Sequence, residues 1–115
     1  PLVSDRNYRI HFTADNLPPV NEFWSITLYS RPENQLKDNP IKRYAFGDRT
    51  PTLQRNADGS IDIYVQQERP EGDKAANWLP SGESGPIWMI LRMYGPKQAA
   101  LEGKFTPPVV ERIDD

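Results

Sequence analysis

Apolar and polar residues alternate one by one in several short stretches of this chain, and this alternation constrains the fold more than any other feature. The stretches YRIHF (8–12) and IDIYV (61–65) place a large apolar or aromatic residue at every second position. The stretch FWSITLYS (23–30) has an aliphatic face and an opposite face that mixes aromatic and hydroxyl residues. A period of two is that of a β-strand with one buried face, so each stretch predicts a strand.

The remaining segments predict further strands and one helix. RYAF (43–46) reads as a short strand, and residues 52–67 read as a β-hairpin whose turn is Asp58-Gly59, a dipeptide that tolerates positive φ. The nearly continuous apolar run IWMILRMY (87–94) predicts a central strand buried on both faces. FTPPVVERI (105–113) predicts an edge strand after paired prolines. Only GPKQAALEG (95–103) has helical signals, with a proline in the first turn and a glycine stop.

Many short strands separated by turns predict an all-β fold with one short helix near the C-terminus. The chain has 12 prolines and 7 glycines, spread along its length as turn residues rather than gathered into one tract. Long connections on both sides of the predicted hairpin favour a jelly-roll or Greek-key β-sandwich over a meander. The length of 115 residues fits one domain, 1–115. Because the chain begins with Pro1 rather than Met, we expect it to be a fragment or C-terminal domain of a longer protein.

Composition excludes several classes of chemistry. There is no cysteine and only one histidine, His11, so thiolate nucleophiles, cysteine-ligated metals and multi-histidine sites are excluded. The formal net charge of −2, with no basic run, predicts no nucleic-acid partner. No apolar run approaches the ~20 residues that a membrane helix needs, so we expect no membrane insertion by this segment. We also expect no cofactor, because no phosphate-binding loop or metal cluster stands out.

One stretch resembles a calcium-binding loop but departs from it. NADGSID (56–62) supplies oxygen ligands from Asn56, Asp58 and Ser60 at the first, third and fifth positions. The twelfth position, which should be a bidentate glutamate, is Gln67, and the flanking segments predict strands rather than helices. We interpret the stretch as a hairpin turn with Asx-type hydrogen bonds, and we predict no metal site.

The best candidate for a binding surface is the long polar connection 68–86, together with the segment after the short strand at 43–46. Connections of this length are uncommon in compact domains and are usually functional or fixed by their own side chains. Two alternatives to binding stay open: an Arg–Asp ion pair that ties a loop to the sheet, and a tryptophan that plugs the end of the sandwich. The candidate ligand-binding residues are Arg43, Asp48, Arg49, Asp73, Asn77 and Trp78.

Several blocks in order resemble those of the bacterial family called domain of unknown function 1214. The blocks are LPPVNEFWSITLY, DNPIKRYAFGDRT, NADGSIDIYVQ, DKAANWLPSG and ILRMYGPKQAALEGKFTPPVVERI, and the resemblance runs from about Tyr8 to Ile113. PSGESGP departs from the family, where a shorter linker resembling PAPKGP is expected. The resemblance implies a jelly-roll β-sandwich that usually ends a longer protein, behind a second β-rich domain or a membrane anchor. An extracytoplasmic location is implied in the same way, whereas no activity is.

Three functions follow from these features. The first is a non-catalytic binding or interaction module, favoured by the absence of a coherent nucleophile, metal cluster or phosphate loop. The second is a hydrolase-like enzyme that uses carboxylates and arginine in a cleft of the sandwich. The third is a structural domain that docks on an N-terminal domain of the same protein, or on a second copy of itself. The third predicts an exposed apolar patch larger than monomers usually show.

Substituting Trp78 separates the plug from the binding platform. If Trp78 fills the open end of the sandwich, Trp78→Ala lowers the free energy of unfolding by about 3–5 kcal/mol, the usual cost of truncating a buried aromatic side chain. Urea denaturation of both proteins measures the difference. Unchanged stability in the variant would favour a surface platform instead.

Overall fold

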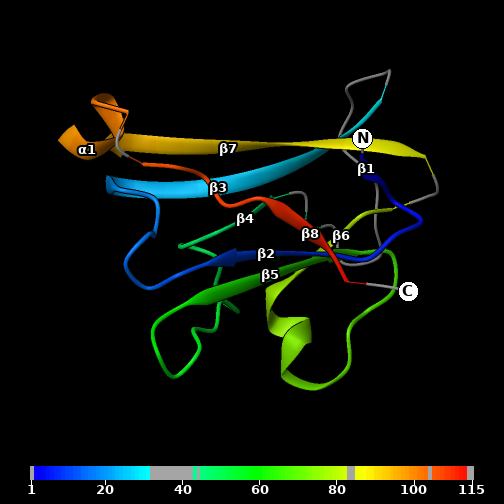
Figure 1. Cartoon of the computed structure of the whole chain (residues 1–115). Helices are drawn as coiled ribbons and strands as arrows, with labels where there is room; N and C mark the ends of the chain where they lie inside the picture. The colour runs from blue at the N-terminus through cyan, green and yellow to red at the C-terminus, as the bar shows by residue number, and fades with distance from the viewer. Residues whose placement is uncertain (1, 32–42, 44, 83–84, 104, 114–115) are drawn as a thin grey trace.

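The computed structural model describes residues 2–31, 43, 45–82, 85–103 and 105–113, which form two four-stranded sheets. Sheet A has the strand order β1-β7-β3-β4, and sheet B has the order β6-β5-β2-β8. Figure 1 shows β7 and β3 of sheet A running above β2 and β5 of sheet B. The predicted all-β sandwich is therefore confirmed. The strands are β1 (Leu2–Val3), β2 (Tyr8–Phe12), β3 (Val20–Ser30), β4 (Ala45–Gly47), β5 (Ile61–Gln66), β6 (Trp78–Pro80), β7 (Pro86–Pro96) and β8 (Val110–Arg112).

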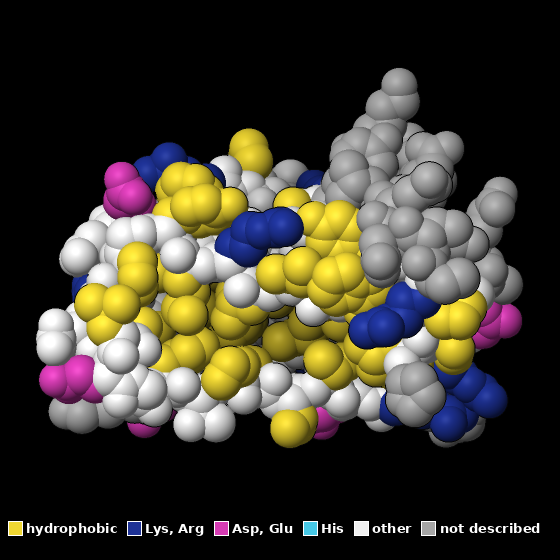
Figure 2. Space-filling model, turned by 90° about the horizontal axis from the view of Figure 1, so that it is seen from above, with side chains coloured by type: hydrophobic (Ala, Val, Ile, Leu, Met, Phe, Trp, Pro, Cys, Tyr) yellow, Lys and Arg dark blue, Asp and Glu magenta, His cyan; other side chains and the backbone are white. Residues whose placement is uncertain are grey.

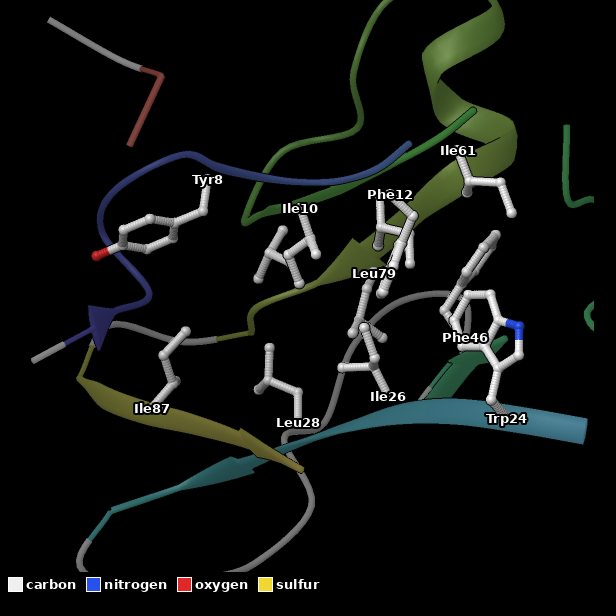
Figure 3. Close-up of a cluster of buried hydrophobic side chains, with 12 residues drawn as sticks. Tyr8, Ile10, Phe12, Trp24, Ile26, Leu28, Phe46, Ile61, Leu79 and Ile87 are labelled. Carbon is white, nitrogen blue, oxygen red and sulfur yellow. The ribbon is translucent and has the colours of Figure 1, made fainter. Parts of the chain in front are cut away.

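The core lies between the facing sides of the two sheets (Figure 3). Alternate residues of β2, β3 and β5 point inward, because successive side chains of a strand face opposite sides of its sheet. Phe46 of β4 and Leu79 of β6 complete the layer on one side, and neither is exposed to solvent. The buried cluster consists of Tyr8, Ile10, Phe12, Trp24, Ile26, Leu28, Phe46, Ile61, Ile63, Val65, Leu79 and Ile87.

Strand β7 is less buried than the sequence predicts. It pairs with β3 along most of its length, but β1 pairs with it only at Pro86 and Ile87. Ile87 is buried, whereas the following side chains are half-buried and Tyr94 is 40% exposed. The prediction of burial on both faces is therefore wrong, because the short β1 leaves most of β7 along one edge of sheet A.

The predicted hairpin at 52–67 is also corrected. Its turn is present, with Gly59 at φ 88° and the Gly59 amide donating to the carbonyl of Asn56 at 2.9 Å. Its first arm, however, is not a strand, and β5 pairs instead with β2 antiparallel and with β6 parallel. The backbone of Gln54 bonds to the side chain of Asn77 rather than to a neighbouring strand. The Asn77 side chain therefore makes the hydrogen bonds to Gln54 that a neighbouring strand would make in the predicted hairpin.

The connection 68–86 is more ordered than predicted. It contains a 3-10 helix, η1 (Gly72–Asn77), followed directly by β6. Both lie beside β5, since β6 pairs with residues 64–66 of that strand. At the other end of the chain, the expected edge strand is confirmed as β8, which pairs with β2. The expected helix is α1 (Gln98–Leu101), shorter than the helical signals suggested.

Candidate functional site

An apolar cleft opens between the two sheets on the side formed by β7 and β8. It encloses about 160 Å³. Figure 2 shows a hollow among hydrophobic side chains on the side of the molecule nearest β7. The inner wall belongs to the core, since Ile10, Phe12 and Ile26 are each at most 4% exposed. The full lining is Ile10, Phe12, Ile26, Met89, Leu91, Pro107, Pro108 and Val110.

The rim of the cleft consists of edge strands and exposed apolar residues. Within the described residues, β7 has no partner strand on the side away from β3 after Ile87. Strand β8 is only three residues long. Next to the cleft lies Val109, whose side chain is 79% exposed. Unpaired strand edges beside apolar surface are uncommon in proteins that act alone, because they invite pairing with another chain.

Trp78 and Arg43 lie together at β6, away from the apolar cleft residues. Trp78 is 4% exposed, and its Nε1 donates to the carbonyl of Gln66 at 2.8 Å. The Arg43 guanidinium donates to the carbonyl of Trp78 at 2.8 Å and to Oγ1 of Thr52 at 3.0 Å. Burial lowers the pKa of Arg43. Trp78 is therefore buried and offers no open platform, although it is not part of the core cluster.

Asn77 and Asp73 border a second, polar cavity of about 230 Å³. Asn77 is 5% exposed, and its amide is fully engaged: Oδ1 accepts from the Gln54 amide at 2.8 Å, and Nδ2 donates to the carbonyls of Gln54 and Asp62. Asp73 is exposed at the mouth of the cavity. Lys74, whose ammonium lies 5.4 Å from the ring centroid of Tyr64, lines the same cavity. The cavity therefore presents both signs of charge.

Asp48 and Arg49 lie apart from the other predicted site residues, just after β4. The Asp48 carboxylate accepts a hydrogen bond from the Trp24 amide at 3.1 Å, so it holds the end of β4 against β3. The Arg49 guanidinium lies 4.2 Å from the ring centroid of Phe23. The six predicted residues thus divide into three places: Arg43 with Trp78, Asp73 with Asn77, and Asp48 with Arg49 beside β3.

Sequence reasoning missed a histidine–carboxylate pair on the outer face of sheet B. The register of β2 and β5 places His11 opposite Asp62, and Nδ1 of His11 lies 2.5 Å from Oδ1 of Asp62. The second Asp62 oxygen accepts from Nδ2 of Asn56 at 3.0 Å. A carboxylate in this position can orient an imidazole for proton transfer. Within the described part of the chain, no hydroxyl group is hydrogen-bonded to His11, so the pair lacks an activated nucleophile.

The stretch that resembles a calcium loop is a turn stabilised by its own side chains. The Asp58 carboxylate accepts from the hydroxyl and the amide of Ser60, and these hydrogen bonds lower the pKa of Asp58. In the ranges that the structure describes, no three histidine, aspartate or glutamate side chains are grouped to hold a metal. None of the described helices has the length and apolar character to cross a membrane.

Comparison with known proteins identifies a family and similar solved structures. The family model described as "Protein of unknown function (DUF1214)" matches residues 1–98, which confirms the resemblance inferred from the sequence. No curated protein matches the chain. The crystal structure of the VPA0106 protein from Vibrio parahaemolyticus is similar, with 30% identity and a TM-score of 0.80. The match covers 96% of this chain but 26% of that one, so this chain spans about a quarter of its length.

Replacing Asn77 tests whether this residue is part of the framework. Asn77→Ala leaves the Gln54 amide and two carbonyls without their partners, so we expect the free energy of unfolding to fall by about 1–3 kcal/mol. Asp73→Ala is the matched control, because its side chain is exposed and its loss changes stability by no more than about 0.5 kcal/mol. Urea denaturation measures both. Equal stability of the two variants would contradict a framework role for Asn77.

Proposed function

This chain belongs to the family of proteins of unknown function DUF1214, and we propose that it is a non-catalytic interaction domain that docks on another part of a longer polypeptide. The observation that carries the proposal is the apolar cleft between β7 and β8, where the core reaches solvent. On the opposite side, at β4 and β6, the core residues Phe46 and Leu79 are both 0% exposed. The core is therefore covered at β6 and reaches solvent between β7 and β8.

The size of the cleft favours an inserted side chain over a free ligand. Small-molecule pockets usually enclose about 300–1,000 Å³, whereas this cleft encloses about 160 Å³. Its lining is apolar apart from backbone atoms, and it holds no ionisable side chain. Burying one aliphatic side chain there contributes about 1.5–3 kcal/mol. The cleft thus suits an apolar side chain carried by a polypeptide that is anchored elsewhere.

The unpaired edge of β7 supplies the second part of the docking surface. A strand laid along residues 89–95 pairs with free backbone groups there and places every second side chain toward the cleft. The VPA0106 match supports a partner within the same polypeptide, since 26% of that chain is covered and 74% lies outside the match. In this proposal the occupant is a strand from the corresponding additional part of the natural protein.

The alternatives from the sequence have less support. Two features support the hydrolase alternative: the His11–Asp62 pair, and a polar cavity lined by two carboxylates, Asp62 and Asp73. It lacks a hydroxyl nucleophile at His11 in the described residues, and only Asp62 of the pair lines the cavity. Ligand binding by Arg43, Asn77 and Trp78 requires breaking the hydrogen bonds that these residues make within the protein.

Placing a charge in the cleft tests docking in the natural polypeptide. Leu91→Arg removes an apolar contact worth about 1.5–3 kcal/mol, so we expect the ratio of docked to undocked protein to fall by about 10- to 150-fold. The readout is thermolysin cleavage beside Val109, which docking protects. Pro107→Arg, at the exposed rim, is a second variant that leaves the core untouched, and far-UV circular dichroism confirms that each variant is folded.

The matched control is Ala57→Arg, which adds the same charge to an exposed turn residue that does not line the cleft. It should leave the cleavage rate unchanged. If the two cleft variants are folded and are cleaved no faster than the natural polypeptide, the cleft is not the docking surface.

A further inference from the structure

The outer face of sheet A differs from an ordinary solvent-exposed sheet face. Residues 24, 26 and 28 of β3 and residues 89, 91 and 93 of β7 point to the core, so the residues between them point outward. The outward positions hold aromatic, hydroxyl and aliphatic residues and one arginine, with no acidic residue. Figure 2 shows basic side chains set among hydrophobic ones on this side. The outward residues are Phe23, Ser25, Thr27, Tyr29, Trp88, Ile90, Arg92 and Tyr94.

The aromatic rings of this face are stacked in cross-strand pairs. Phe23 stacks on Tyr94 with 4.3 Å between ring centroids, and Tyr29 stacks on Trp88 at 5.0 Å. Such pairs are the usual unit of stabilisation between neighbouring strands. One face of each ring is therefore covered by its stacked partner, and Tyr94 remains 40% exposed.

An arginine guanidinium lies over one ring of each aromatic pair. The Arg49 guanidinium lies 4.2 Å from the Phe23 centroid, and that of Arg31 lies 5.4 Å from the Trp88 centroid. Between the two pairs, Arg92 donates to the hydroxyl of Tyr29 at 3.0 Å and to Oγ1 of Thr27 at 3.2 Å. The rings fix the position of the guanidinium groups, because a cation is attracted to a ring face.

The charges on this face are not compensated. In the described part of the chain, Arg31, Arg49 and Arg92 form no ion pair with a carboxylate. The outer face of sheet B is different, since Arg9 pairs with Glu111 at 3.0 Å and lies 4.0 Å from Asp62. Although the whole chain has a net charge of −2, sheet A therefore presents a positive face.

We propose that the outer face of sheet A binds an extended acidic polypeptide segment through Arg31, Arg49 and Arg92. A guanidinium presents a planar fork of donors that matches a carboxylate. Phe23 and Tyr29 are six residues apart on β3, so the arginines are distributed over roughly 20 Å at ~3.3 Å per residue, the reach of a segment of similar length.

The ring geometry favours an acidic polypeptide over single-stranded nucleic acid and over acidic polysaccharide. Nucleobases and sugar rings bind to aromatic side chains through open ring faces, whereas Phe23 and Trp88 each already contact a ring and a guanidinium. Carboxylates need only the outward edges of the guanidinium groups. Met89 and Leu91 of β7 line the cleft, whereas Arg92 belongs to the outer face, so different side chains carry the two proposed surfaces.

The test is binding of fluorescent poly-L-glutamate to the chain, measured by fluorescence anisotropy at low salt. We expect Arg49→Gln/Arg92→Gln to weaken binding by roughly 2- to 25-fold, since one exposed ion pair contributes about 1.4- to 5-fold. The control double variant, Arg55→Gln/Arg69→Gln, removes the same charge from exposed residues outside sheet A and should leave binding within the measurement error.

Two further measurements can overturn the proposal. Labelled polygalacturonate and a single-stranded oligonucleotide of equal charge should each bind more weakly than poly-L-glutamate, and tighter binding of either would show that the face recognises another polymer. The single variant Arg49→Gln alters only an exposed side chain and keeps the test valid if the double variant unfolds. Absence of poly-L-glutamate binding, or equal loss in the control variant, would also contradict the proposal.

Discussion

The parallel pairing of β6 with β5 is the interaction on which the rest of the sandwich depends. It places Trp78, Leu79 and Pro80 beside Tyr64, Val65 and Gln66. Strand β6 has only three residues, too few for its backbone hydrogen bonds to β5 to hold it in place. Side chains supply the remaining hydrogen bonds. Asn77 bonds to Gln54 and Asp62, and Arg43 bonds to the Trp78 carbonyl. These contacts turn a long connection into a wall of the core.

Because β6 covers the core on one side only, the two sides of the sandwich differ in how far the core is exposed. At β4 and β6 the core is sealed by Phe46 and Leu79, which are not exposed. At β7 and β8 no comparable strand of the described residues completes the sheets, and the core opens into an apolar cleft. The outer faces also differ among the described residues, since Arg9 of sheet B pairs with Glu111 and the arginines on sheet A form no ion pair. Both asymmetries are explained if this domain is one part of a larger assembly and carries its contact surfaces on the β7 side.

The sequence predicts the elements whose side chains alternate and misses those that depend on distant partners. Strands β2, β3 and β5 follow directly from periodicity, as does the edge strand β8 after its paired prolines. Strand β6 is too short to alternate and ends in proline, so only its pairing with β5 defines it. The first arm of the predicted hairpin alternates weakly, but the Asn77 amide binds Gln54 and removes that backbone from any ladder.

The candidate site was only partly predictable for the same reason. Trp78 and Asn77 stand out in the sequence as residues that should fix a loop, and both are buried. His11 and Asp62 are 51 residues apart, and only the register of β2 with β5 brings them together. The cleft cannot be deduced from periodicity, because it arises where β1 and β8 are too short to cover β7.

The most direct measurement is amide hydrogen exchange of β7, compared between this chain alone and a longer polypeptide of the kind that the docking proposal requires. The amides of residues 89–95 that point away from β3 should exchange at least about tenfold more slowly in the longer polypeptide, since a docked strand gives them partners. The amides of residues 64 and 65, where β5 has β2 on one side and β6 on the other, serve as the internal reference. Equal exchange of the β7 amides in the two proteins would contradict the account.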